Sequence, residues 1–506
     1  MPYLQTACYR HSLYYHYLLQ TAEQLYNMGG KSVVQGLDIF DVERENLLSG
    51  YWWAASNWTD EKAVRLCSDY DDEGVNCLNL RLSPTERIRW IETGLKAARL
   101  HLDREGELSH LGNLGSAYKD ADEAPKAIEC YQQALALAKE LGYREDEGRL
   151  LNSLGIIYSD SMGNPQEAFG LFEQALQISR EVGNRKDEGN SLDNLGNAYW
   201  ASGDSLRAIE FSQQHLSIAR EIGDSVGESS ALCNLGIASL SVGEPRKALA
   251  YYRQSRKIAH FLGDQSQEIS ILCGIGNAYS YLGKRERAIG YFNKALELSR
   301  SPTSKSSEAF VLGNLAYYYE AEKNLEKAIY LYKQQLLVYQ ELGNRQREGN
   351  ALGNLGIAYW YLKDLDKAKA YQQQWLEIAR EIGDRGSQSY ALGNLGLICH
   401  DAGDHPGAIS YFRQTLKIVR QLNDPNGEAN ALWNMAIAQK DIGKLKQAIK
   451  NAKAANELYK KTENHHAEMV DNSLIKWQAE LDQIALPTKS DTKKSSKQNR
   501  HHQANR

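Results

Sequence analysis

The chain has 506 residues, of which 42% are hydrophobic and 24% are charged, and its formal net charge is −5. This balance of charges gives no sign of nucleic-acid or membrane-surface binding. No apolar run approaches the roughly 18 residues of a membrane-spanning helix. Residues 1–20 lack a secretory pattern. The seven cysteines are scattered and form no CxxC pair, so we predict neither a disulfide framework nor a zinc site, and we expect a reduced, cytoplasmic protein.

Residues 1–106 predict helices without a regular repeat. The stretches YYHYLLQTAEQLY and DVERENLLSGYWWAA, at 14–26 and 41–55, have helical patterns. Between them, Gly29-Gly30-Lys31 resembles the end of a phosphate-binding loop, but Leu25 stands where a Walker A loop needs glycine. We therefore predict a turn between two helices at this point and no bound nucleotide.

A further helix is predicted to begin at Ser83-Pro84-Thr85-Glu86, where a capping residue is followed by a first-turn proline and an acid. The pattern RIRWIETGLKAARLHLD then runs to residue 103. It has the place of the second helix of a repeat whose first helix is degenerate.

From residue 107 onward, one motif recurs nine times, beginning with LGNLGSAY at 111–118. The copies are forty residues apart, apart from a single spacing of forty-one between Gly155 and Gly196. Such a period predicts a solenoid, in which each unit buries its apolar face against its neighbours. The fifth letter of the motif, which we use as the anchor of each copy, falls at Gly115, Gly155, Gly196, Gly236, Gly276, Ala316, Gly356, Gly396 and Ala436.

Each repeat contains two helical patterns. In the first, leucine stands four residues before every anchor, and another large aliphatic residue stands one residue before it. These positions share one helix face, so the pattern predicts an amphipathic helix. Glycine at the anchor costs roughly 1 kcal/mol of helix propensity relative to alanine. Its recurrence therefore predicts the close approach of a second helix.

The second pattern supplies that helix. Every copy has an alanine in its first turns, and an aromatic residue usually follows four residues later. The aromatic is missing at Ser212, Gln372 and Ala452. Most copies end in phrases such as AREIGDR, whose glycine is a predicted C-cap.

The motif combines a small residue, a tyrosine, an alanine and an aromatic, and it recurs in nine in-phase copies. It resembles the tetratricopeptide repeat, in the forty-residue form found in kinesin light chain and Partner-of-Inscuteable-type proteins. The resemblance covers residues 107–459. Residues 11–115 are also similar to the segment that leads into the tetratricopeptide sensor of bacterial STAND signalling NTPases, although the NTPase itself has no counterpart here. The resemblance implies an all-α, right-handed superhelix of about nine repeats, preceded by an irregular helical segment.

We expect three regions: an irregular helical segment at 1–106, a solenoid with a C-terminal capping helix at 107–485, and a disordered basic tail at 486–506. The capping helix is predicted at 466–484, with Trp477 and Leu481 as its apolar anchors.

No motif for catalysis, cofactor binding or metal binding is present, and the histidines are dispersed along the chain. A glutamate stands eight residues before each anchor, with Gln388 as the one exception, and is interpreted as a partner of the helix N-terminus. An asparagine two residues before the anchor has two open interpretations: a ladder between repeats, or contact with the backbone of a bound peptide.

Four positions share one face of each first helix: three residues before the anchor, and one, four and five residues after it. In tetratricopeptide proteins this side of the first helix lines the concave groove. Large aromatics gather there, mostly in the second half, where a solvent-facing helix would carry Lys and Glu. They either bind a partner or pack between successive first helices. Together with two of the recurring asparagines, the candidate peptide-binding residues are Asn197, Trp200, Asn277, Tyr281, Tyr317, Asn354, Trp360, Tyr361, Asn394, His400 and Trp433.

We therefore predict a non-enzymatic scaffold that binds a peptide or partner protein in the concave groove, without a cofactor and without nucleic acid or membrane as partner. The alternative is a sensor arm of a STAND-like system that acts with a separate NTPase or effector. We expect the partner to contact Tyr317, Trp360, Tyr361 and Trp433 in the second half of the solenoid.

Overall fold

A computed structural model of the chain describes residues 2–28, 31–72, 74–121, 123–162, 164–300, 305–462 and 464–485. Within these ranges all regular elements are helices, so the predicted all-α repeat fold is confirmed. Two predictions, the turn at Gly29-Gly30 and the disordered tail at 486–506, lie outside the described residues. The chain divides into two compact units, Met1–Ala351 with Glu381–Asp384, and Leu352–Arg380 with Arg385–Arg506.

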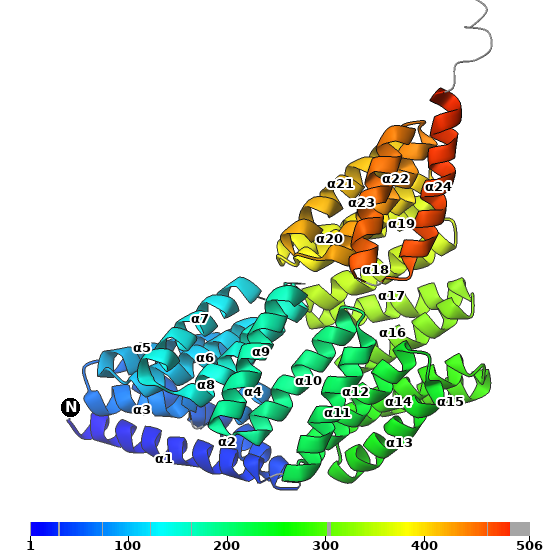
Figure 1. Cartoon of the computed structure of the whole chain (residues 1–506). Coiled ribbons are helices and arrows are strands. Elements are labelled where there is room, and N and C mark those ends of the chain that lie inside the picture. The colour runs from blue at the N-terminus through cyan, green and yellow to red at the C-terminus, as the bar shows by residue number, and fades with distance from the viewer. Residues whose placement is uncertain are drawn as a thin grey trace, which may run out of the picture. The chain divides into compact units, whose positions relative to one another are not determined.

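The helices follow one another along the chain in the order shown in Figure 1. The N-terminal segment contains α1 (Pro2–Asn27), α2 (Lys31–Ser56), α3 (Glu61–Asp72), α4 (Val75–Arg81) and α5 (Pro84–His101). The first helices of the nine repeats are α6 (Arg104–Asp120), α8 (Arg144–Ile156), α10 (Arg185–Ala201), α12 (Ser225–Ser241), α14 (Gln265–Tyr281), α16 (Lys305–Ala321), α18 (Arg345–Tyr361), α20 (Arg385–Asp401) and α22 (Pro425–Asp441). The second helices are α7 (Ala124–Leu141), α9 (Pro165–Val182), α11 (Ser205–Ile222), α13 (Pro245–Leu262), α15 (Arg285–Ser299), α17 (Leu325–Leu342), α19 (Leu365–Glu381), α21 (His405–Gln421) and α23 (Leu445–Lys461). A π-helix, η1 (Ile157–Ser161), follows α8, and α24 (His466–Ala485) closes the series.

The N-terminal segment is a helical bundle with its own aromatic core. Tyr51 of α2 stacks on Trp90 of α5, with ring centroids 3.6 Å apart, and its hydroxyl donates a hydrogen bond to the Trp90 carbonyl. The predicted start of α5 is confirmed, because Ser83 and Glu86 form a reciprocal capping box. Helix α5 packs against both α3 and α6, so α3 has the place of the degenerate first helix.

Side chains and glycines at the helix ends mark the repeat boundaries. Aspartate or asparagine caps several helices by accepting a hydrogen bond from the third backbone N–H, as Asp224 does for α12 and Asp204 for α11. Gly223, after α11, has a left-handed backbone with φ of 71°, a conformation that glycine adopts without steric cost. Short turns therefore connect α11 to the helices before and after it, and consecutive helices from α5 to α17 pack against one another.

The anchor glycines lie against side chains of the second helix of the same repeat, in agreement with the predicted close approach of that helix. A Cβ added to Gly236 would lie 2.5 Å from the ring of Tyr252 on the second helix, and one added to Gly115 would lie 2.7 Å from Tyr131. Phe412 stands against Gly396 in the same way. The aromatic ring fills the volume that a side chain at the anchor would need, so glycine and aromatic form one packing unit.

The single forty-one-residue spacing has a local structural cause. The extra residue lies between Gly155 and Ala168, and in this interval the first helix ends in the π-helix η1. A π turn accommodates one additional residue without shifting the following helix out of register. Ser159 and Asp160 occupy this turn, at the end of a first helix.

The recurring glutamate is held by cations, which goes beyond the predicted role at the helix N-terminus. The carboxylate of Glu188 is buried and accepts hydrogen bonds from Arg180, in the preceding second helix, and from Arg185, in its own first turn. Arg185 also pairs with Glu221 of the next second helix. The same arrangement recurs around Glu147. In these two repeats the ion pairs connect three successive helices at one end of the repeat.

In the second unit, α24 covers the last repeat. The ring of Trp477 stacks on that of Trp433 in α22, with centroids 5.4 Å apart and planes inclined by 10°. Leu481 packs against the same apolar cluster, which includes Phe412 and Tyr459. None of the helices in the described ranges combines the length and the hydrophobicity that crossing a membrane requires.

Candidate functional site

The predicted groove residues of the first unit lie on first helices, with unequal exposure. Tyr281 and Tyr317 are more than half exposed, and Trp200 is 46% exposed. Asn197 is also exposed, whereas Asn277 is half-buried and donates a hydrogen bond to Asn314 of the next repeat. The three aromatics among the predicted groove residues of this unit therefore present surface to solvent.

In the second unit, most of the predicted groove residues are half-buried. Tyr361 is exposed, but Trp360, His400 and Asn394 are only partly so. Trp433 lies under the capping helix, stacked on Trp477, so it belongs largely to the solenoid's own packing. Asn354 is half-buried in α18.

A hydrogen bond between neighbouring repeats recurs along this face. The residue four positions after one anchor donates to the residue five positions after the next: Trp200 to Ser241, at 3.0 Å, and Trp360 to Asp401, at 2.9 Å. His400 and Asp441 form the third such pair, at 2.7 Å. These bonds support, for the indole and imidazole groups, the interpretation that the side chains pack between successive first helices.

Several of the recurring asparagines bond to the preceding repeat or its helices. Asn194 donates to Asn152, Asn234 donates to Asp193, and Asn394 donates to Gln372. Asn314 instead donates to the carbonyl of Phe310 within its own helix. The ladder between repeats is thus partial, and its members Asn152, Asn194 and Asn234 line the hollows described next.

A cavity of about 310 Å³ opens where the packing unit of glycine and aromatic is interrupted. Ser212 stands opposite Gly196 in place of the aromatic ring, so the volume that Phe172 or Tyr252 fills in neighbouring repeats is empty here. Among the residues that line it are Asn197 and Trp200, both predicted groove residues. Ser159 and Asp160 of the π turn, together with Asn194 and Asn234, complete its polar rim.

A second hollow, of about 530 Å³, adjoins this cavity along α10 and shares Ile156 and Asn194 with it. Its lining includes a buried histidine, His215, whose Nδ1 lies 2.9 Å from a carboxylate oxygen of Asp193. Asn234 donates to the same oxygen. The two hollows together form a groove over α8, α10 and α12, which we call the α10 groove.

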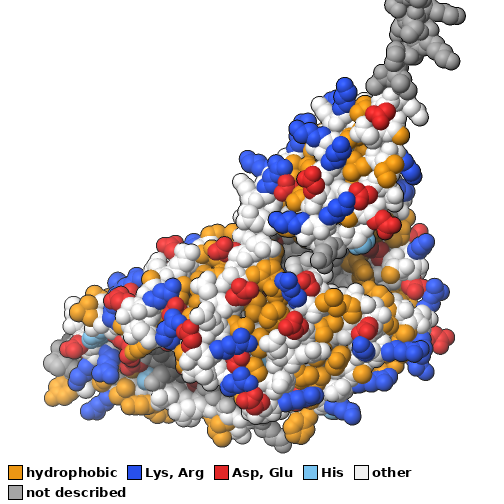
Figure 2. Space-filling model, viewed as in Figure 1, with side chains coloured by type: hydrophobic (Ala, Val, Ile, Leu, Met, Phe, Trp, Pro, Cys, Tyr) orange, Lys and Arg blue, Asp and Glu red, His pale blue; other side chains and the backbone are white. Residues whose placement is uncertain are grey.

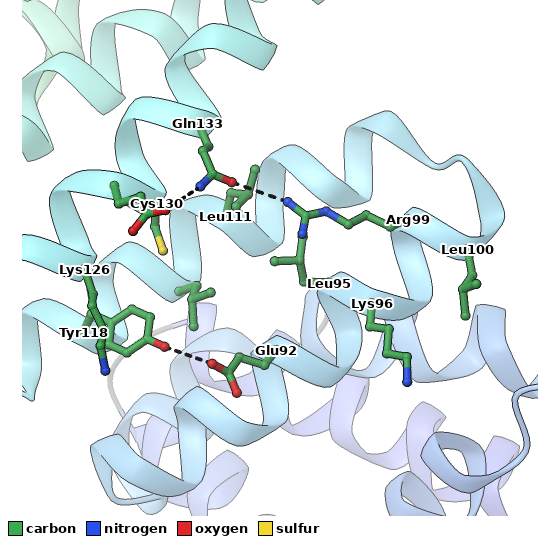
Figure 3. A pocket seen from close by; sticks show the side chains of 12 residues that line it. Glu92, Leu95, Lys96, Arg99, Leu100, Leu111, Tyr118, Lys126, Cys130 and Gln133 are labelled. Atoms are coloured by element: carbon green, nitrogen blue, oxygen red, sulfur yellow. Dashed lines mark hydrogen bonds between the residues drawn. The ribbon is translucent and has the colours of Figure 1, made fainter.

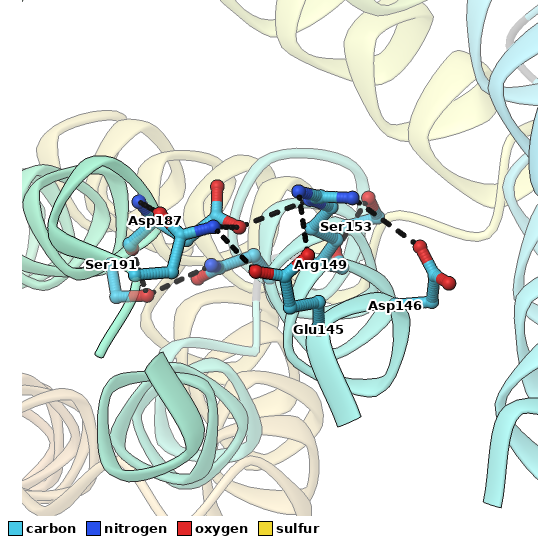
Figure 4. Close-up of polar contacts among 8 residues, drawn as sticks. Glu145, Asp146, Arg149, Ser153, Asp187 and Ser191 are labelled. Atoms are coloured by element: carbon cyan, nitrogen blue, oxygen red, sulfur yellow. Dashed lines mark hydrogen bonds and ion pairs between the residues drawn. The ribbon is translucent and has the colours of Figure 1, made fainter. Parts of the chain in front are cut away.

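One border of the α10 groove is a charged network, shown in Figure 4. The guanidinium of Arg149 bridges two repeats, with Nε 3.0 Å from Asp187 and NH1 3.4 Å from Asp146. In the same network, Asn152 donates to the hydroxyl of Ser191. Because Arg149 and Asp187 both line the hollow, a bound chain would meet charges of both signs there.

At the other border, the side chain of Gln346 donates a hydrogen bond to the backbone carbonyl of Asp160. The start of α18 therefore lies beside the π turn. Burial raises the pKa of the Asp160 carboxyl above its usual range, with Lys119 and Arg347 acting in the opposite direction.

A further cavity of about 520 Å³ lies among α5, α6 and α7 (Figure 3). The polar side chains that line it are largely paired with one another: the hydroxyl of Tyr118 donates to Glu92, and Arg99 donates to Gln133 and pairs with Glu107. None of the predicted groove residues lines this cavity.

Charged side chains of both signs are interspersed on the face of the first unit seen in Figure 2, with hydrophobic side chains between them.

The repeat geometry corresponds to a known family. The tetratricopeptide repeat family matches residues 106–181, 149–221, 187–260, 227–301, 307–381 and 387–461, which together make up more than half of the chain. The chain belongs to the tetratricopeptide repeat family. The predicted resemblance is confirmed, and the match extends to repeats that lack the aromatic of the second helix.

Several solved tetratricopeptide structures are similar to this chain. Yeast Tom70 is 13% identical, with a TM-score of 0.54 over 95% of this chain and 99% of Tom70. A STAND protein with a tetratricopeptide repeat sensor from Pyrococcus horikoshii is 18% identical, with a TM-score of 0.40 over 81% of this chain and 63% of that protein. Kinesin light chain-like repeats from Podospora anserina are 20% identical, with a TM-score of 0.34 over 38% of this chain and 94% of theirs. No curated protein sequence matches significantly. At these identities the structural likeness concerns the fold alone.

Proposed function

We propose that the chain is a non-enzymatic scaffold that binds a peptide segment of a partner protein in the α10 groove. The tetratricopeptide repeat fold is generally a protein-interaction scaffold, and an α-solenoid offers an extended surface for this purpose. One observation carries the location: Ser212 leaves a cavity beside Gly196, in the register where other repeats place an aromatic ring.

The size and lining of the cavity suit a single large side chain of the bound peptide. At about 310 Å³, the cavity is at the lower limit of small-molecule sites, and Phe172, Ile237 and Trp200 provide apolar walls. An aromatic or aliphatic residue that entered it would restore the packing that the repeat lacks. Burial of such a side chain contributes roughly 1.5–3 kcal/mol.

The polar residues of the groove suit the backbone and flanking residues of an extended peptide. The amides of Asn194, Asn197 and Asn234 each offer both a donor and an acceptor, which is what a peptide group requires. Further along, the second hollow is lined by Arg149 and Lys186 and also by Asp187 and Asp193, so it favours a polar segment of mixed charge.

The test uses a random peptide library displayed on phage and selected against the full chain, followed by calorimetric titration of a selected peptide. Ser212→Phe fills the cavity with the residue type that neighbouring repeats have, so it is expected to weaken binding by about 2 kcal/mol while leaving the melting temperature unchanged or higher. Trp200→Ala removes an apolar wall and is expected to weaken binding to a similar extent.

Leu206→Ala is the matched control, because Leu206 is 73% exposed on α11 of the same repeat and lines neither hollow. If Ser212→Phe and Trp200→Ala bind as tightly as Leu206→Ala, the proposed location is wrong. The double variant Trp360→Ala, Tyr361→Ala tests the expectation that the second-half aromatics bind the partner. The regulatory alternative, a sensor arm for a separate NTPase, stays a prediction from the sequence resemblance.

A further inference from the structure

Three potential metal ligands converge at the ends of three helices in the second unit. His400 is in the last turn of α20, His405 begins α21, and Asp441 ends α22. One ligand atom from each of the three lies within 4.8 Å of the others. The rings of His400 and His405 lie edge to face, with centroids 5.1 Å apart.

This cluster departs from the pattern of the other repeats in a specific way. The bond from His400 to Asp441 occupies the position that the bond from Trp360 to Asp401 occupies one repeat earlier. An indole has a single N–H and no lone pair to offer, whereas an imidazole has a second nitrogen. Among the nine copies, only this repeat has histidine both four and nine residues after its anchor, Gly396.

The surroundings leave one polar atom without a partner. Nδ1 of His405 is buried and has no hydrogen-bond partner among the described residues. Beside the cluster, Asp401 approaches Nδ1 of His400, at 3.8 Å, and accepts hydrogen bonds from Trp360 and Lys363. The site thus combines two imidazoles, one ligating carboxylate and a second carboxylate that can orient an imidazole.

We propose that His400, His405 and Asp441 bind a divalent transition metal ion of the zinc class. Neutral imidazole nitrogen and carboxylate oxygen are ligands that Zn²⁺ prefers in a tetrahedral site, with water in the fourth position. Zn–N and Zn–O bonds of about 2.0–2.2 Å require ligand atoms roughly 3.3 Å apart, so small side-chain rotations from the present spacing suffice. Because the ligands come from α20, α21 and α22, the bound ion would cross-link two successive repeats.

Other histidines must be separated from this site in any test. His465 and His466 have adjacent rings, with centroids 4.1 Å apart, and His501 and His502 are neighbours in the sequence. Adjacent histidines alone bind Zn²⁺ weakly, so a matched variant that removes them is required.

The test is calorimetric titration of ZnCl₂ into the metal-free full chain carrying His465→Ala, His466→Ala, His501→Ala and His502→Ala. This background is expected to bind one ion. His400→Gln retains a donor for Asp441 but removes the imidazole, and His405→Ala removes the second ligand; each is expected to weaken zinc binding at least about tenfold. With Co²⁺ as the probe, visible absorption bands of a four-coordinate site are expected in the background chain and not in either variant.

A thermal melt provides a second readout, since an ion that bridges two repeats should raise the melting temperature of the background chain and not that of His405→Ala. The proposal is overturned if the background chain binds no zinc, or if His400→Gln and His405→Ala bind it as the background does. The melting curves of the metal-free variants are the folding control. If these curves match that of the background chain, a loss of zinc binding is not due to a loss of folding.

Discussion

At the scale of residues, the fold depends on a repeated contact between glycine and an aromatic ring. Where the anchor is Gly236, the ring of Tyr252 occupies the space of the missing side chain. Ala316 shows that a methyl group is tolerated at one anchor, with Tyr332 still buried nearby. A larger side chain has no such room.

Gly236→Leu is expected to lower the free energy of unfolding by about 3 kcal/mol, because the added atoms must displace Tyr252 from a close-packed core. Gly290→Leu is the control: Gly290 is also helical, and a Cβ there meets nothing within 4 Å. The control is expected to be stabilising by up to about 1 kcal/mol, since leucine has the higher helix propensity. Urea melts of both variants measure the difference, and equal effects would show that anchor packing is not the cause.

The sequence was sufficient to predict a close approach of the second helix at the anchor, but not that the aromatic ring itself lies against the anchor glycine. It also marked Ser212, Gln372 and Ala452 as positions without the ring. The sequence could not predict what occupies the space at each position that lacks the aromatic ring. At Gln372 the amide donates to the Gly353 carbonyl and fills the space, whereas at Ser212 a cavity is left. These outcomes depend on neighbouring side chains that no spacing rule specifies.

At the scale of elements, the π turn η1 links the single irregular repeat spacing in the sequence to the rim of the α10 groove. The spacing of forty-one residues was visible, but periodicity alone does not say where along a repeat the extra residue is absorbed. The structure places it at Ile157–Ser161, and the turn contributes Ser159 and Asp160 to the rim of the cavity. For the aromatics of the second half, a helical wheel does not reveal burial by a neighbouring helix: Tyr361 is exposed, whereas Trp433 lies under Trp477, and binding of a partner at these residues stays a prediction.

Deleting Asp160 would restore the forty-residue spacing and is expected to convert the π turn into continuous α-helix. Helical content by circular dichroism should be retained, because the register of α9 and α10 then matches that of the other repeats. Affinity for a peptide selected on the intact chain should fall, since the rim of the cavity is rebuilt. If the affinity for the peptide is retained, the π turn has no part in peptide binding.

At the scale of the whole molecule, each repeat contacts its neighbours, so a local defect should stay local. Trp477 joins α24 to the last repeat through its stack on Trp433. Trp477→Ala is expected to accelerate amide hydrogen exchange in α22, α23 and α24, while leaving α6 to α9 unchanged. Uniformly faster exchange would mean that the chain unfolds as one cooperative block.

The most direct measurement of the central claim is hydrogen–deuterium exchange of the full chain with and without a selected peptide. If the peptide lies in the α10 groove, protection should concentrate in residues 156–160, 194–201 and 234–238, which line the cavity at Ser212. Ser212→Phe should abolish that protection at the same peptide concentration. Protection confined to α18, α20 and α22, or protection at the cavity that survives Ser212→Phe, would contradict the account.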